Sequence, residues 1–151
     1  MPPLFTIGYE KAAPSDVMAA LKQAKIQLLV DTRAVAASRR AGFSKRQLAA
    51  GLDEIGIPYL HLQKLGTPAE GREAARSGDF KKLWKIYNKH IKTAPAQAEL
   101  DELEKLARTK RVCLLCYERD PNECHRLRIS ELMHERTGQK VEHLFASPLG
   151  I

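Results

Sequence analysis

The chain has 151 residues, enough for one domain with a buried core and too few for two. Its net charge of +7 favours anionic partners such as phosphates, nucleotides or nucleic acid, although a generally basic soluble protein carries the same charge without an anion site. The sequence has no apolar run of membrane-spanning length, no signal-peptide pattern and only three cysteines. These features argue against a membrane protein and a disulfide scaffold, and they predict a cytoplasmic protein.

Strand-like and helical segments alternate through the first half of the chain. A short apolar run that ends in glycine, Leu4–Gly8, predicts a first strand, and the apolar spacing after Pro14 predicts a helix to about Lys25. Ser44 with Gln47 three residues later is a capping-box pattern, which predicts the start of another helix. The expected elements of this region are a strand at 26–31, a loop at 32–43, a helix at 44–56 and a strand at 57–62.

The second half continues the alternation after a long connection. Glycine and proline punctuate residues 65–79, which we expect to form a loop. Asp79 is the expected N-cap of a helix with the apolar stripe Phe80, Leu83, Trp84, Tyr87 and Ile91. The remaining predicted elements are a helix at 96–108, a strand at 112–116, a helix from 124 to Gly138 and a strand at 141–145.

This alternation predicts an α/β fold in a single domain over residues 1–151. We expect a three-layer sandwich, in which a mostly parallel sheet of about five strands lies between helices on both faces. Right-handed crossovers place the carboxyl ends of parallel strands at one edge, where open α/β sheets bind ligands. Polar residues that end or follow the strands should therefore share one crevice: Tyr9, Asp31, Arg33, His61, Cys116 and Glu118.

The turn between the fourth strand and the next helix concentrates reactive side chain types. It contains Cys116, Glu118, Cys124, His125 and Arg126 within eleven residues. Cys124 is expected at the first turn of the helix, where the positive end of the helix dipole stabilises a thiolate, the reactive form of cysteine. The turn therefore predicts a reactive-cysteine or anion-binding site.

The cysteine spacing leaves several roles open. Cys113 and Cys116 lie three residues apart in a strand and face opposite sides, so Cys113 is expected in the core. Cys116 and Cys124 can face each other as a redox pair, or bind a metal with His125 or His61. Zinc sites usually place about two to four residues between cysteines, so we predict no metal and no other cofactor. Alternatively, Cys124 packs under the sheet as a structural cysteine.

The loop after the second strand is strongly basic. Between Thr32 and Leu52 there are five cations and no acid. Arginine forks match phosphate or carboxylate, a helix that begins at Ser44 offers free N–H groups, and Phe43 offers a ring on which a base can stack. The predicted ligand-binding residues are Tyr9, Arg33, Ser38, Arg39, Arg40, Ser44, Lys45, His125 and Arg126. The alternative is a solvated loop that Asp31 orders through an ion pair with Arg33 or Arg39.

Four motifs in order resemble the domain of unknown function 488 family: TIGYE, VDTRAVAASRRAGFSK, YLHLQKLGTP and LLCYERDPNECHR. The resemblance extends from Thr6 to His143, and the joint occurrence of the four motifs is specific. It implies a small α/β domain with two characteristic cysteines, here Cys116 and Cys124. It implies no established activity.

Two classes of function follow from these patterns. The first is an enzyme that uses a cysteine thiolate on a phosphorylated or nucleotide-like anionic substrate held by arginines. Its predicted catalytic residues are Cys124, Cys116, Glu118, His61 and Asp31. The second is a nucleic-acid or nucleotide binding module in which the cysteines are structural or redox-active. The enzyme is preferred because nucleophile, acid and base types occur together; the expected partner is an anionic small molecule or nucleic acid, and no membrane.

Overall fold

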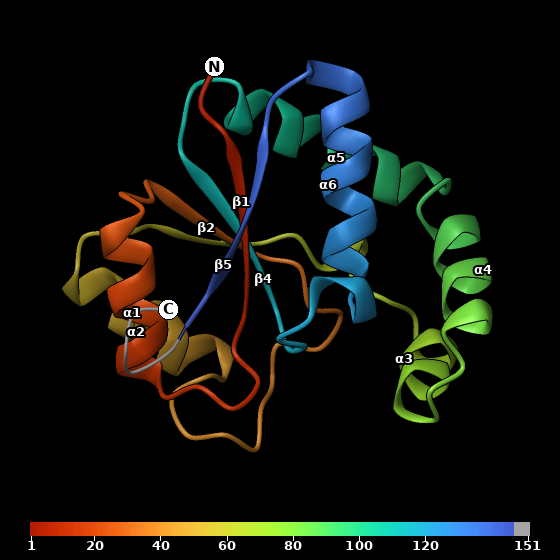
Figure 1. Ribbon diagram of the computed structural model, residues 1–151, viewed down its shortest axis with the longest axis horizontal. Helices are drawn as coiled ribbons and strands as arrows, with labels where there is room; N and C mark the ends of the chain where they lie inside the picture. Colours follow the sequence, from red (N-terminus) through yellow and green to blue (C-terminus); the bar gives the residue numbers. More distant parts are fainter. Residues whose placement is uncertain (147–151) are drawn as a thin grey trace.

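The computed structural model describes residues 1–146, and within them five strands form one sheet in the order β3-β2-β4-β1-β5 (Figure 1). The strands are β1 (Leu4–Gly8), β2 (Leu28–Asp31), β3 (Tyr59–His61), β4 (Val112–Cys116) and β5 (Val141–Phe145). All four pairings between neighbouring strands are parallel. The predicted parallel sheet is thus confirmed.

Six α-helices of the described chain connect and cover these strands. They are α1 (Pro14–Gln23), α2 (Lys45–Glu54), α3 (Ala69–Arg76), α4 (Phe80–His90), α5 (Ala94–Ala107) and α6 (His125–Thr137). In addition, short 3-10 turns occur at Gln63–Leu65 (η1) and Pro121–Glu123 (η2). None of the helices in residues 1–146 combines the length and the apolar character that crossing a membrane requires.

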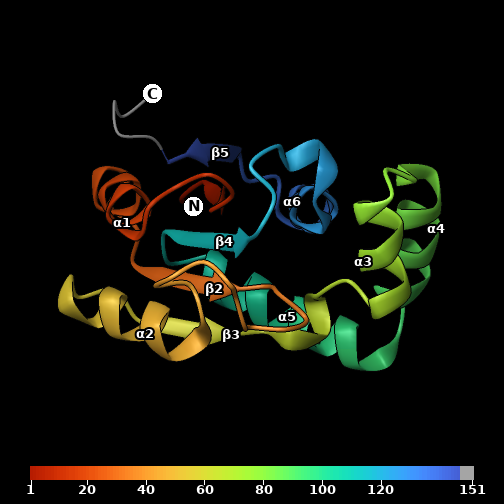
Figure 2. The same cartoon turned by 90° about the horizontal axis from the view of Figure 1, so that it is seen from below.

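The sheet separates two apolar cores. Side chains alternate along a strand, so Leu4 belongs to one core and Phe5 to the other. One core contains residues of α4, α5 and α6, and the other contains residues of α1 and α2. Figure 2 shows α1 and α2 on one side of the sheet and α5 and α6 on the other, with α3 and α4 packed beyond them. Helices on both faces confirm the predicted α/β sandwich.

The three internal strands, β2, β4 and β1, are buried along their whole length. Every residue of β1 and β4 is buried, which explains why both read as continuous apolar runs. Burial of each large aliphatic side chain contributes about 1.5–3 kcal/mol, so these strands anchor the sheet. In the register of the sheet Gly8 lies opposite Cys116, and Asp31 lies opposite Leu115 and His61. The carboxyl ends of β1, β2, β3 and β4 therefore meet at one edge.

The prediction of a loop at 65–79 is wrong, because Ala69–Arg76 within this segment form the helix α3. Gly71 suggested a break, but it lies inside α3, where a side chain would collide with the Cγ2 atom of Thr67. The glycine therefore allows close packing and does not end the helix. The capping box at the start of α2 is also absent: Ser44 makes no side-chain cap bond, and the Oε1 atom of Gln47 accepts the Gly42 N–H instead.

Candidate functional site

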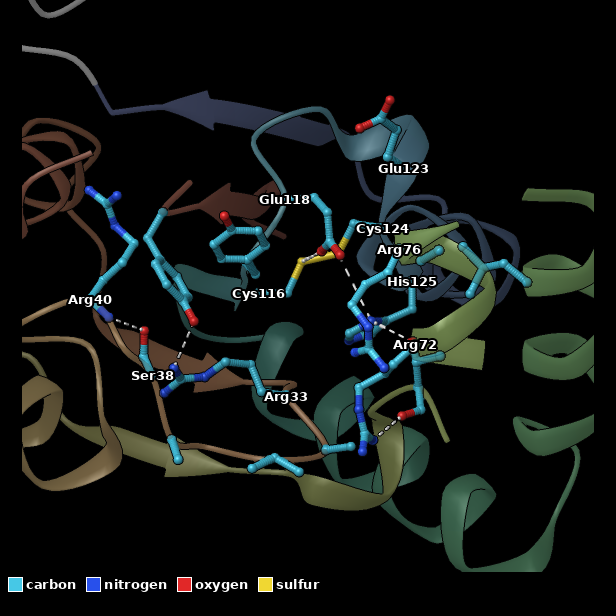
Figure 3. A pocket seen from close by; sticks show the side chains of 18 of the residues that line it. Arg33, Ser38, Arg40, Arg72, Arg76, Cys116, Glu118, Glu123, Cys124 and His125 are labelled. Carbon is cyan, nitrogen blue, oxygen red and sulfur yellow. Dashed lines mark hydrogen bonds between the residues drawn. A yellow bond between two sulfur atoms is a disulfide. The ribbon is translucent and has the colours of Figure 1, made fainter. Parts of the chain in front are cut away.

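A pocket of about 450 Å³ opens at the carboxyl edge of the sheet (Figure 3). Its walls come from five segments: the end of β1, the loop after β2, the start and face of α3, Leu83 of α4, and the turn between β4 and α6. This is the edge at which parallel α/β sheets bind ligands. Its size is in the range of small-molecule sites.

Cys116 and Cys124 lie in this pocket and are joined by a disulfide bond. Cys116 is the last residue of β4, whereas Cys124 is the N-cap of α6, and its Sγ atom accepts the backbone N–H of Arg126 at 3.5 Å. The predicted position of Cys124 at a helix start is thus confirmed. Each cysteine is 1% exposed, so the sulfur atoms form the floor of the pocket. By contrast, Cys113 is free and buried in the core of α1 and α2.

Arg126 lies directly behind the cysteine pair. It is completely buried, and its guanidinium donates to the Sγ atom of Cys116 at 3.1 Å, to the hydroxyl of Thr6 and to the carbonyls of Glu118 and Arg119. No carboxylate of residues 1–146 lies within ion-pair distance of it. Burial lowers the pKa of Arg126 to about 10. A buried guanidinium without a carboxylate partner favours a negative charge on the adjacent sulfur.

Gly8 makes this arrangement possible. A side chain at this position would collide with the Glu118 carbonyl and touch the guanidinium of Arg126. The turn after β4 therefore lies against bare backbone of β1, and the arginine reaches past it to the sulfur atom of Cys116.

His125 lies beside Cys124 as a neutral base. Its Nε2 atom lies 2.9 Å from the carbonyl oxygen of Thr32, which can only accept, so Nε2 carries the proton. Its Nδ1 atom is then unprotonated, accepts the hydroxyl of Thr67 at 2.9 Å and lies 3.9 Å from the Sγ atom of Cys124. Burial lowers the pKa of His125 to about 4. The ring is therefore neutral at pH 7, and its unprotonated nitrogen, which accepts the Thr67 hydroxyl, also lies near a cysteine sulfur.

Glu118 lies beside Cys116 and can act as an acid, whereas His125 lies beside Cys124 as a base. One of its carboxylate oxygens lies 3.7 Å from the Sγ atom of Cys116. Burial raises the pKa of Glu118 above the usual range of a carboxyl group. A carboxyl group with a raised pKa holds its proton more tightly than an exposed one, which suits a role as an acid.

Five arginines line the pocket: Arg33, Arg39, Arg40, Arg72 and Arg76. The guanidinium of Arg33 is largely occupied, because it pairs with Asp31 at 2.7 Å and donates to Tyr9 and to the Phe43 carbonyl. Arg40 donates to the Ala12 carbonyl, and one nitrogen of Arg72 donates to the Thr67 carbonyl. The remaining donors of Arg72, together with exposed Arg39 and Arg76, are available to an anion. Figure 3 shows Arg72 and Arg76 on the side of the pocket near His125.

The predicted site residues divide into two groups. The pocket is lined by Tyr9, Arg33, Ser38, Arg39, Arg40, Cys116, Glu118, Cys124 and His125. Outside its lining lie Asp31, Ser44, Lys45, His61 and Arg126.

Asp31 and His61 hold the loop after β2 and do not reach the pocket. The Asp31 carboxylate is buried between the guanidinium of Arg33 and the hydroxyl of Tyr59, and His61 contacts the Arg33 carbonyl at 2.7 Å. The sequence left open an ion pair between Asp31 and Arg33, and the structure contains it. Phe43 is buried and stacks on the ring of Tyr9, with centroids 4.4 Å apart, so its faces are not free for a base.

Sequence reasoning missed the contributions of Thr32, Thr67, Arg72 and Arg76. Both threonines position the ring of His125. The two arginines lie on α3, which we predicted to be a loop. Their spacing of four residues was a usable signal, because residues i and i+4 share one face of a helix.

The residues at the pocket floor are of types that can also bind soft metals. The sulfur atoms of Cys116 and Cys124 and a ring nitrogen of His125 lie within 4.8 Å of one another. However, the Cys116 sulfur already receives the guanidinium of Arg126, whose fixed positive charge opposes a cation at this position. The geometry therefore favours a cysteine pair over a metal centre.

The fold and the site together define a parallel α/β domain with a cysteine pair in an arginine-lined pocket at the carboxyl edge of its sheet. A family model described as "Domain of unknown function DUF488" matches residues 13–133. Because this match covers most of the chain, the protein belongs to that family. No curated protein and no solved structure matches the chain significantly.

Proposed function

We propose that this protein is a cysteine-dependent enzyme that acts on a small phosphorylated or nucleotide-like anion bound in the pocket. One observation carries the proposal: the cysteine pair, a neutral histidine nitrogen 3.9 Å from the Cys124 sulfur and five arginines occur in the same pocket. Such a combination provides a nucleophile, a base and an anion site together.

The reduced pair supplies the nucleophile in this proposal. The Nδ1 atom of His125 accepts the proton of the Cys124 thiol during attack on the substrate, in place of the Thr67 hydroxyl, and the N-terminus of α6 stabilises negative charge on the sulfur. Arg72 and Arg76 hold the anionic group of the substrate, and Glu118 provides a proton to the leaving group. Positioned proton transfer of this kind contributes about 10²–10⁴-fold to a rate.

The lining of the pocket also supports a substrate with an apolar or flat part. Val35 is 54% exposed and the ring of Tyr117 is 44% exposed, and both line the pocket. Large exposed apolar side chains beside a pocket suit a ligand surface such as a nucleotide base.

A nucleic-acid binding module is the second candidate. Exposed cations on the loop after β2 and at the start of α2 support it: Arg39, Arg40, Lys45 and Arg46. The burial of Phe43 removes the aromatic ring on which this loop could have stacked a base.

The selectivity of alkylation tests the enzyme proposal. The reduced protein is treated with iodoacetate, an anion, and with neutral iodoacetamide, and modification of each cysteine is followed by mass spectrometry. For each cysteine, the rate with iodoacetate is divided by the rate with iodoacetamide, and this ratio is then divided by the same ratio for the chain unfolded in urea. We expect the corrected ratio at Cys116 and Cys124 to be about tenfold above one, because nearby guanidinium groups attract the anionic reagent.

Two arginine variants and two ligands complete this test. Arg72→Gln combined with Arg76→Gln should reduce the preference for iodoacetate, whereas Arg108→Gln, which removes an exposed arginine that follows α5 and does not line the pocket, should leave it unchanged. Adenosine monophosphate and pyrophosphate should each slow alkylation of the wild-type pair. A corrected ratio of one, without protection by either ligand, would refute the proposal.

A further inference from the structure

We infer that Cys116 and Cys124 form a redox-active couple that exchanges with small anionic thiols and disulfides in the same pocket, and that Arg126 makes this couple oxidising. The inference rests on the proposed function for its pocket, and it adds a substrate class and a reaction to that site.

The disulfide contributes little as a structural cross-link. It joins residues only eight positions apart, and the entropic stabilisation by a disulfide is smallest for short loops. Other bonds already close the same turn: Arg126 donates to the carbonyls of Glu118 and Arg119, and the Asp120 side chain caps η2. The turn therefore keeps its shape through these hydrogen bonds when the disulfide opens.

Two features stabilise the reduced form relative to the disulfide. The buried guanidinium of Arg126 has no carboxylate partner within residues 1–146, and a thiolate at Cys116 would supply the missing negative charge 3.1 Å away. The Cys124 sulfur lies at the N-terminus of α6, which extends from His125 to Thr137 and also favours a thiolate. A dithiol that is stabilised in this way forms an oxidising disulfide.

The position of the sulfur atoms defines the size and charge of the partner. Each cysteine is only 1% exposed, so the surface of a folded protein cannot reach the disulfide. A small thiol that enters the pocket can reach it, and there it meets the free donors of Arg72 and the exposed guanidinium groups of Arg39 and Arg76. These cations select a thiol that carries a carboxylate, sulfonate or phosphate group.

The reaction is a two-electron thiol–disulfide exchange in two displacements. A small thiolate attacks the Cys124 sulfur, a mixed disulfide forms, and the bond between the protein sulfurs breaks, with Cys116 leaving as the thiolate beside Arg126. A second small thiolate attacks the sulfur of the bound thiol, which releases the small disulfide and the Cys124 thiolate. The protein disulfide gains two electrons, and the two small thiolates lose them. The same steps in reverse reduce a small anionic disulfide.

The role of Arg126 is tested at equilibrium in buffers of 2-mercaptoethanol and 2-hydroxyethyl disulfide, both of which are neutral. The fraction of oxidised protein is measured by acid quenching and mass spectrometry. Arg126→Gln should shift the equilibrium toward the disulfide by about tenfold or more, because one charge interaction next to the thiolate is lost. Arg126→Lys should restore most of the wild-type equilibrium, and Arg128→Gln, which removes an arginine of α6 bonded to Asn88, should not change it. An unchanged equilibrium in Arg126→Gln would overturn the assigned role.

The partner class is tested with wild-type protein, so that no variant needs to fold. The protein is oxidised with diamide and then reduced with 2-mercaptoethanesulfonate, 2-mercaptoethanol or cysteamine, which are anionic, neutral and cationic. Each rate is divided by the rate for the oxidised chain in urea, which corrects for the intrinsic reactivity of the thiol. We expect the order anionic, neutral, cationic, with about a tenfold range that shrinks at high salt.

Two results would overturn the inference. One is a set of equal or reversed corrected rates, and the other is the recovery of three free thiols after diamide treatment. If iodoacetate still alkylates the reduced pair preferentially, the proposed anionic enzyme site stands and only the redox couple fails. If that preference is absent while Arg126→Gln shifts the equilibrium, the couple stands and the anion site fails.

Discussion

The neutral state of His125 makes the stability of the fold sensitive to acid. Burial lowers the pKa of His125 to about 4, from an ordinary value of 6.5. Because the folded pKa lies below the unfolded one, the unfolded chain binds the proton first as the pH falls. The part of the unfolding free energy that depends on the protonation of His125 is therefore greatest above pH 6.5, where the ring is neutral in both states. It is lost progressively as the pH falls through about 4. A difference of about 2.5 units, at about 1.4 kcal/mol per unit, corresponds to about 3 kcal/mol of unfolding free energy.

Urea unfolding at pH 7 and pH 4 measures this loss in the protein kept reduced with a phosphine. His125→Gln is the informative variant, because its amide can still donate to the carbonyl of Thr32 but cannot be charged. The wild type should lose about 3 kcal/mol more than this variant between the two pH values. Glu118, whose raised pKa adds stability as the pH falls, is present in both proteins. Its contribution therefore cancels when the wild type is compared with the variant. His134→Gln removes an exposed histidine from the same helix and serves as the control.

Equal losses in the wild type and in His125→Gln, to within about 0.5 kcal/mol, would refute this reasoning. Such a result would mean that the ring accepts a proton in the folded protein as easily as in the unfolded chain. His125 would then be charged in mild acid and would no longer be a free base beside Cys124.

Three further predictions concern the surroundings of the pocket. Asp31→Ala removes the only ion-pair partner that the buried guanidinium of Arg33 has within residues 1–146. It should lower the unfolding free energy, measured in urea, by about 3–5 kcal/mol, and a loss below about 1 kcal/mol would contradict the buried pair. Gly8→Ala places a methyl group against the Glu118 carbonyl, so it should displace the cysteine turn and change the alkylation rate of Cys116, and a wild-type rate would argue against this contact. If nucleic acid binds, Arg39→Ala and Arg40→Ala should each reduce the slope of log affinity against log salt concentration by about one unit per lost phosphate contact. Titration of labelled DNA and RNA measures this slope, and absence of binding at low salt would eliminate nucleic acid as the partner.

The sequence was sufficient to predict the sheet because its buried strands appear as short apolar runs between helices. The runs at Val112–Cys116 and Val141–Phe145 were predicted with the observed bounds, since short apolar segments between helices indicate strands. β3 lies at the edge of the sheet and is only half-buried, so it is shorter than its apolar run, Tyr59–His61 against the expected 57–62. Helix α3 was missed because glycine is a helix breaker in isolation, and only the packing against Thr67 explains Gly71.

The site was predictable to the level of the sheet edge and not to the level of side-chain direction. Topology alone brings Asp31, His61 and Cys116 to that edge. Hydrogen bonds then decide which of them reach the pocket, and Asp31 and His61 turn toward the backbone and side chain of Arg33. Arg126 was expected to bind a ligand, but the space above Gly8 lets it pass behind the cysteines instead. The course of Arg126 depends on Thr6 and Gly8, more than 100 positions away in the sequence, which local patterns do not reveal.

The pH dependence of alkylation at the three cysteines tests most directly whether the pair of Cys116 and Cys124 is chemically active. The reduced protein is treated with iodoacetamide over a pH series, and each cysteine is followed separately by mass spectrometry. We expect Cys116 and Cys124 to react with midpoints below about 8.5, the value of an ordinary thiol, because Arg126 and the N-terminus of α6 stabilise their thiolates. Burial raises the pKa of Cys113, so that cysteine should remain unmodified until the chain unfolds. Midpoints near 8.5 for the pair, or modification of Cys113 at an equal or higher rate, would contradict a reactive cysteine pair.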